Sequence, residues 1–187
     1  GKHIMTTQND ETALGQGSSV KMETQETMKI IAAGNIFTGT FERDGMGGIL
    51  TLGRNFECRP NKLKGYYKYT SAKVSVSKGH LNEGEDDLCS LYIALTDEQI
   101  TVNTNKGIYF DPNSSAVIAY GSISDEESKG ADSFKEFTVD LEYKDLKRIP
   151  KYIIVVASSS KYGDYMEGGK GSTMWLDDLE LVYPKSM

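Results

Sequence analysis

The chain has 187 residues, a length that suits one domain with room for a substantial hydrophobic core. It carries 21 Lys and Arg residues against 27 Asp and Glu residues, which gives a net charge of -6. Nucleic acids and anionic membranes bind proteins through clustered Lys and Arg, so this acidic chain fits neither partner.

The composition favours strands and turns over helices, because 11 Tyr and 19 Gly residues stand against only 4 Pro. No run of 18 apolar residues is present, so we expect no transmembrane helix. A charged start followed by an apolar stretch is also missing, so we expect no signal peptide in this chain.

The first part of the chain differs from the rest. Residues 1–16 are polar and irregular, so we expect an N-terminal arm, followed by a single β-sandwich domain over residues 17–187. The run 18–24 alternates apolar and polar residues, and glycines interrupt the run 28–41. Short runs of this kind, separated by turn residues, are typical of strands.

Longer strand candidates follow in the runs 62–77, 87–96, 134–143, 151–157 and 174–183. The clearest is 134–143, where Phe137, Val139, Leu141 and Tyr143 share one face and polar residues occupy the other. The run 151–157 is apolar on both faces, as in a central strand. Eight or more short strands joined by polar loops predict an all-β fold, an antiparallel β-sandwich or barrel.

The segment "GGKGST", residues 168–173, follows an apolar strand and raises the question of a phosphate-binding loop. That motif needs Ser or Thr directly after its Lys and a glycine six residues before it, but Lys170 is followed by Gly171 and preceded at that position by Asp164. The motif also opens a helix, whereas 174–183 alternates like a strand. We therefore interpret this segment as a hairpin-type loop between two strands.

The same region resembles a known family. The stretch "YIIVVASSSKYGDYMEGGKGSTMWLDDLELVY" is similar to the C-terminal signature of the putative carbohydrate metabolism domain family, and "AAGNIFTGTF", "CRPNKLKGYYKY" and "LYIALT" fit in order. The resemblance covers the chain from about residue 17 onward. One departure is the start of the chain, which lacks the Gly-x-Phe-Glu-like segment and the Trp with which similar domains begin.

The resemblance implies a jelly-roll β-sandwich similar to carbohydrate-binding modules. It also implies export to the cell surface or outer membrane of a Gram-negative bacterium, as part of a lipoprotein whose lipid anchor lies outside this chain.

Aromatic residues are the first candidates for a binding site, because sugars stack their apolar C–H faces on aromatic rings. If Tyr67 and Tyr69 face the core, Tyr66 faces outward, and Tyr92 is likewise opposite the apolar face of its strand. We expect these two outward tyrosines to form a stacking platform, although strand propensity alone also explains them. Trp175 is a core residue or a stacking residue at the rim.

Two charged residues are further candidates. Arg59 precedes Pro60, and its guanidinium suits a uronate or sulfate group, or a salt bridge at a strand start. Asp177 is expected to point inward, where a buried carboxylate needs hydrogen bonds or a cation. The resemblance implies a structural calcium at Asp177; the alternative is that it accepts N–H groups from the turn 158–165.

Catalytic signals are weak. A glycosidase needs two carboxylates across one cleft, and spacing selects no pair among Glu42, Glu57, Glu85, Asp86, Asp87, Asp164 and Glu167. His3 and His80 lie far apart and predict neither a zinc site nor a catalytic triad. Cys58 and Cys89 are interpreted as small buried residues, with a single bridge as the alternative.

The sequence therefore leads to three hypotheses. The first is a non-catalytic glycan-recognition module of an exported surface lipoprotein, which binds a polysaccharide through exposed aromatic and polar loop residues. The second is a glycoside hydrolase with paired carboxylates. The third is a structural or adhesive module of the cell surface.

Overall fold

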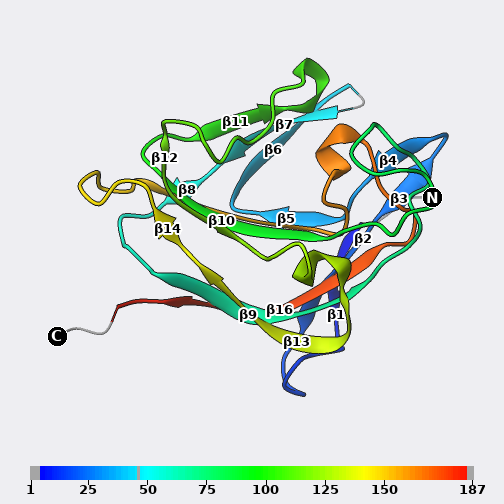
Figure 1. The fold of residues 1–187 in the computed structure, drawn as a ribbon, viewed down its shortest axis with the longest axis horizontal. Helices are drawn as coiled ribbons and strands as arrows, with labels where there is room; N and C mark the ends of the chain where they lie inside the picture. Colours follow the sequence, from blue (N-terminus) through cyan, green and yellow to red (C-terminus); the bar gives the residue numbers. More distant parts are fainter. Residues whose placement is uncertain (1–4, 46, 185–187) are drawn as a thin grey trace.

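The computed structural model of the chain describes residues 5–45 and 47–184, which form antiparallel β-sheets joined by loops and three short 3-10 helices. Figure 1 shows two sheets stacked face to face, as predicted for a β-sandwich. In the described part of the chain, no helix is long and apolar enough to cross a membrane.

The first layer is a five-stranded sheet. Its strands, in spatial order, are β1 (Thr6–Asn9), β2 (Ser19–Glu23), β16 (Thr173–Val182), β9 (Lys62–Thr70) and β13 (Ala131–Asp140). The second layer is a six-stranded sheet of β14 (Glu142–Tyr143), β12 (Val117–Ser122), β10 (Ser90–Thr96), β15 (Tyr152–Ser158) and β5 (Asn35–Phe37), with β8 (Arg54–Asn55) also paired to β15.

Smaller elements lie outside these two layers. A three-stranded sheet of β11 (Ile100–Asn103), β7 (Gly47–Leu52) and β6 (Gly39–Asp44) packs on the outer face of the six-stranded sheet (Figure 1). A two-stranded ribbon consists of β3 (Gln25–Thr27) and β4 (Ile30–Ala32). The 3-10 helices are η1 (Thr104–Lys106), η2 (Glu127–Lys129) and η3 (Gly163–Tyr165).

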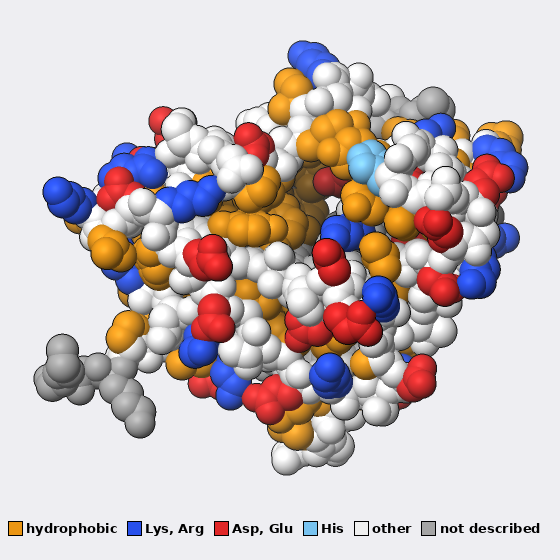
Figure 2. All heavy atoms as spheres, viewed as in Figure 1, with side chains coloured by type: hydrophobic (Ala, Val, Ile, Leu, Met, Phe, Trp, Pro, Cys, Tyr) orange, Lys and Arg blue, Asp and Glu red, His pale blue; other side chains and the backbone are white. Residues whose placement is uncertain are grey.

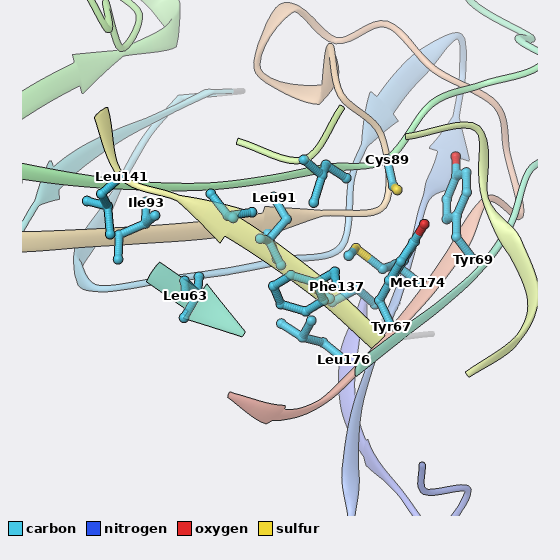
Figure 3. Packing of buried hydrophobic residues seen from close by; sticks show 14 of the residues in the cluster. Leu63, Tyr67, Tyr69, Cys89, Leu91, Ile93, Phe137, Leu141, Met174 and Leu176 are labelled. Carbon is cyan, nitrogen blue, oxygen red and sulfur yellow. The ribbon is translucent and has the colours of Figure 1, made fainter. Parts of the chain in front are cut away.

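The main core lies between the two large sheets, and Figure 3 shows residues from both sheets meeting there. The predicted alternation is confirmed along β13, where Phe137 and Val139 are buried and Glu136, Thr138 and Asp140 are exposed. Tyr67 of β9 meets Phe137 edge to face, with ring centroids 6.0 Å apart. This arrangement leaves the other face of each sheet for solvent, for other elements or for ligands.

A second, smaller core lies between the six-stranded sheet and the three-stranded sheet. Ala94 and Ile154 from the large sheet pack with Leu52 and Val102 from the small one. This covering explains why β15 is apolar on both faces, as predicted for a central strand. The small sheet covers only part of this outer face, and the uncovered part carries aromatic residues.

Two predictions differ from the structure. Residues 6–9 of the predicted arm 1–16 form edge strand β1, which pairs with β2, so this part of the arm belongs to the sandwich, while residues 1–4 lie outside the described residues. The segment 168–173 is also not a hairpin loop, since it connects β15 and β16, which lie in different sheets. The strand that follows it confirms that this is no phosphate-binding loop, which would open a helix.

Both cysteines are free, but only Cys89 is buried, so the predicted burial of Cys58 is wrong. Burial of the Cys89 thiol in the main core raises its pKa to about 12.

Candidate functional site

The candidate site is an aromatic cleft of about 400 Å³ on the outer face of the six-stranded sheet. Strands β10 and β12 form its floor, and the loops after η1, β12 and β15 form its walls. Figure 2 shows a hollow surrounded by hydrophobic side chains, with a histidine at its rim. The aromatic cleft is lined by Tyr92, Tyr109, Phe110, Tyr120, Tyr162 and Tyr165 together with Ser90, Ser122, Asp125, Lys161 and Asp164, among others.

The aromatic residues of the cleft form two stacked pairs. Tyr109 lies on Tyr165 with ring centroids 3.9 Å apart and planes inclined by 26°. Tyr92 lies on Phe110 with centroids 4.9 Å apart and planes inclined by 17°. Because each pair joins residues distant in sequence, the stacks fix the loop after η1 against both the floor and the opposite wall.

Local structure explains how the walls present these rings. Tyr92 points outward because its neighbours Leu91 and Ile93 face the main core. The turn of η3 ends at Met166, whose left-handed conformation (φ 58°) reverses the chain directly after Tyr165. That reversal leaves Tyr165 on a short projecting turn that reaches Tyr109.

Two carboxylates line the cleft. Asp164 of η3 is solvent-exposed, but the protein surrounds it closely enough that desolvation raises the pKa of its carboxyl. Among the described residues its carboxylate has no hydrogen-bond donor and no cationic partner within hydrogen-bonding distance. Asp125 is exposed as well, and its carboxylate pairs with Lys161 at 3.2 Å.

A buried carboxylate supports the loop that carries η3. Asp87 is fully buried, and one of its oxygens accepts hydrogen bonds from the Ser160 hydroxyl at 2.6 Å, the Gly169 N–H at 2.8 Å and the Ser172 hydroxyl at 2.8 Å. The other oxygen accepts from the Leu88 N–H at 2.8 Å. Desolvation outweighs these donors and raises the pKa of Asp87. The glycine-rich segment is therefore fixed by a protein carboxylate.

A second buried carboxylate joins this loop to the loop 77–85. Glu167 accepts N–H groups of Lys78, His80 and Leu81, and the His80 Nδ1–H at 2.9 Å. Although burial opposes ionisation, these donors together lower the pKa of Glu167. His80 in turn stacks on Tyr162 of the cleft wall, with centroids 4.3 Å apart.

The structure separates the two predicted stacking tyrosines. Tyr92 lines the aromatic cleft, whereas Tyr66 lies on the outer face of the five-stranded sheet, opposite Glu136 in register. The predicted joint platform of these residues is therefore wrong, because the two sheets have their outer faces on opposite sides of the sandwich.

Arg59 and Trp175 also lie away from the cleft. The Arg59 guanidinium donates to the carbonyl oxygens of Arg148 at 2.5 Å and Asp145 at 3.4 Å and lies over the Tyr143 ring, so it fixes the loop after β14. Trp175 is half-buried on the outer face of the five-stranded sheet, with the Lys68 ammonium 4.2 Å from its ring centroid.

Asp177 faces the N-terminal segment. It is buried, but its register opposite outward-facing Tyr66 places it on the outer face and not toward the core as expected. Its oxygens accept the N–H groups of Ala13 at 2.8 Å and Asp178 at 3.0 Å, neither of which belongs to the turn 158–165. Because N–H donors occupy the carboxylate, and the described residues include no metal-binding cluster of His, Cys, Asp or Glu, Asp177 does not fit a calcium ion.

The sequence reasoning missed most of the cleft. Tyr109, Phe110, Tyr162 and Tyr165 lie in loops, where no alternation points to a common face. The density of tyrosines in "SSSKYGDYMEGG" was the available signal, because aromatic residues in polar loops have no core to fill.

The fold is a β-sandwich with an aromatic cleft on one outer face, and a β-sandwich is what the resemblance seen in the sequence implies. Residues 2–182 match the family described as Putative carbohydrate metabolism domain, and the chain belongs to this family. No curated protein sequence matches the chain.

Two solved structures have a similar fold. One is a putative glycoside hydrolase from Bacteroides thetaiotaomicron VPI-5482, with a TM-score of 0.79 and 25% identity over 98% of this chain. The chain spans 58% of the length of that protein. The other is a putative glycoside hydrolase from Bacteroides vulgatus ATCC 8482, with a TM-score of 0.76 and 24% identity, covering 95% of this chain and 77% of that one.

Proposed function

We propose that the chain is a non-catalytic glycan-recognition module that binds a polysaccharide in the aromatic cleft. The observation that carries this proposal is the set of partly exposed aromatic rings converging on one hollow that also holds polar groups. Sugar rings combine apolar C–H faces with hydroxyl edges, so they need this mixture of aromatic surface and hydrogen-bonding groups.

The parts of the cleft have separate roles in this proposal. Tyr162 and Tyr109 offer ring surface to the apolar face of a sugar, because both belong to walls held by stacking partners. Asp164 offers acceptors to sugar hydroxyls, and Lys161 is a donor beside it. A cleft whose walls are already fixed loses little conformational entropy on binding.

The test is a glycan array followed by calorimetric titration of any glycan that binds. Tyr162→Ala is expected to weaken binding roughly 5- to 150-fold, if a sugar ring gains about the 1–3 kcal/mol that a nucleic-acid base gains by stacking on an aromatic side chain. Tyr66→Ala is the matched control, because it removes an outward tyrosine from the opposite face. Equal loss in both variants, or no bound glycan on the array, contradicts the proposal.

Glycoside hydrolysis is the second candidate function. Asp164, with its raised pKa, suits a general acid, and Asp125 is a second carboxylate in the same cleft. The similar solved proteins, themselves described as putative glycoside hydrolases, add to this alternative. Sugar release from a bound oligosaccharide, abolished in Asp164→Asn, would favour hydrolysis over recognition alone.

We also propose that the module acts outside the cell, as the family resemblance implies, anchored through a lipid on a segment beyond this chain. Fractionation of cells that express the full-length gene product tests this, with surface protease accessibility as the readout. If the protein reaches the surface but binds no glycan, the structural or adhesive hypothesis takes precedence.

A further inference from the structure

An inner recess adjoins the aromatic cleft at Asp164. This inner recess has a volume of about 60 Å³ and lies between the six-stranded sheet and the small sheet. Asp164, Lys161, Tyr92 and Ser90 line both the cleft and the recess, so the two spaces meet at these side chains. Since one water needs about 10–15 Å³ of such space, the recess holds a group of roughly four non-hydrogen atoms.

Strand register gives the floor of the recess a polar row and an apolar row. Ser90 of β10 pairs with Ser158 of β15, which pairs with Asn35 of β5. At the position two residues away on each of these strands, Tyr92 pairs with Val156, and Val156 pairs with Phe37. Because side chains two residues apart share a face, both rows point into the recess, and Leu50 covers it from the small sheet.

Two side chains that line the recess have hydrogen-bonding groups without a partner in the protein. Among the described residues, the Ser90 hydroxyl and the Asp164 carboxylate form no hydrogen bond, whereas the Ser158 hydroxyl donates to the Ser160 carbonyl at 2.9 Å. Ser90 therefore supplies a donor, and Asp164 supplies an acceptor at the mouth of the recess. A ligand group that enters needs a donor near its attachment point, an acceptor further in and an apolar end.

We propose that the inner recess binds the acetamido group of a neutral 2-acetamido sugar. The amide N–H donates to Asp164, the carbonyl oxygen accepts from Ser90, and the methyl group packs on Phe37, Val156 and Leu50. A hydroxyl or a free ammonium at the same position of the sugar is too short to reach the apolar end of the recess, so that end stays empty. This assignment rests on the proposed function and names the sugar class for the same site.

The charged side chains of the cleft further restrict the class of sugar that it binds. The cleft holds two carboxylates and one ammonium, and the ammonium of Lys161 is already paired with Asp125. An anionic sugar would place its carboxylate or sulfate near Asp164 without a free cation to pair with, which disfavours uronates and sulfated sugars. The preferred ligand is therefore not anionic, and the apolar end of the recess, not the charge, selects an acetamido group over a free ammonium.

The experiment is an NMR titration with sugars that differ only at C2. N-acetylglucosamine, glucosamine and glucose form one set, and the corresponding galactose compounds form the second. We expect at least one acetamido sugar to bind roughly tenfold or more tightly than its two partners, as deletion of a group from a fitted pocket costs about 10–200-fold. Ser90→Leu fills the recess and should remove this preference, and Ser133→Leu, the same substitution at an exposed position of β13 outside the cleft and the recess, should keep it.

The outcomes separate the two proposals. Equal affinity within each set overturns the acetamido assignment and leaves glycan recognition standing. A complete lack of sugar binding, together with an empty glycan array, overturns both. If Ser90→Leu lowers the melting temperature strongly, Ser90→Ala replaces it, and an unchanged preference in that variant contradicts the assigned role of the hydroxyl.

Discussion

Tyr109 and Tyr165 face each other across the wall of the aromatic cleft, with ring centroids 3.9 Å apart and planes inclined by 26°. One residue follows η1 and the other ends η3, so this stack joins two loops that leave different strands. The cleft therefore keeps its shape through contacts between its own aromatic residues, before any ligand is present.

Tyr109→Ala is expected to loosen both loops and to weaken glycan binding, whereas Tyr109→Phe keeps the ring and should leave both unchanged. Hydrogen exchange of the amides in 105–111 and 161–166 reports on the loops. If the alanine variant exchanges no faster than the parent, the stack does not hold the cleft.

Asp87→Asn is expected to lower the free energy of unfolding by about 1–3 kcal/mol, because the amide NH2 cannot accept a hydrogen bond and leaves a buried donor, such as the Leu88 N–H, without an acceptor. Urea unfolding measures the change. Asp86→Asn is the matched control, since Asp86 is exposed and forms a solvent-accessible pair with Lys73, a kind of pair that contributes less than about 1 kcal/mol. Similar losses in both variants would show that the Asp87 cluster has no special role.

Glu167 should make the stability depend on pH in a defined direction. Its pKa in the folded protein lies below the ordinary value, so its stabilising contribution is complete above the unfolded-state pKa of about 4.3. The contribution is lost as the pH falls through the lower pKa of the folded state. The free-energy difference between the parent and Glu167→Gln should therefore shrink as the pH falls below about 4. A difference that stays constant with pH contradicts this account.

Asp87 makes the stability depend on pH in the opposite direction. Because its pKa is raised in the folded protein, its ionisation costs stability as the pH rises from the unfolded-state value of about 3.9 through the folded-state value. The difference in unfolding free energy between the parent and Asp87→Asn should therefore fall across that interval, because the other carboxyl groups titrate alike in both proteins. A rise there would mean that the hydrogen bonds to Asp87 outweigh its desolvation.

Trp175 is expected to contribute through its contact with Lys68. Lys68→Met keeps most of the packing but removes the charge above the ring, so we expect a loss of about 0.5–1 kcal/mol. Lys68 also pairs with Glu11, and Glu11→Gln isolates that ion pair as a control. If Glu11→Gln costs as much as Lys68→Met, the ion pair accounts for the effect and the ring does not.

The strands were predictable from their burial, because most bury one face and β15 is apolar on both. In β13 and β9, Phe137, Val139, Leu63 and Tyr67 repeat every second residue toward one core, and the sequence displays that period directly. The pairing between strands was not predictable in the same way. The strand pairing places Tyr66 and Tyr92 on opposite sides of the sandwich, although the sequence correctly predicted that both face outward.

The cleft was harder to predict because long-range contacts build it. In the sequence, Asp87 and Glu167 look like ordinary acidic loop residues. Only the folded chain brings hydrogen-bond donors from 160–172 to Asp87 and from 78–81 to Glu167. The role of Asp177 was missed for a related reason. A bulge after it changes the alternation of β16, and the left-handed conformation of Asp178 (φ 48°) marks that change.

The most direct test of the central claim is an NMR titration of the isotope-labelled protein with an oligosaccharide selected on the glycan array. We expect amide shifts to change in 90–92, 109–111 and 161–166, around the aromatic cleft, and to stay constant near Tyr66 and Trp175 on the opposite face. Shift changes confined to the five-stranded sheet would contradict the account, because they would place the glycan on the other side of the sandwich.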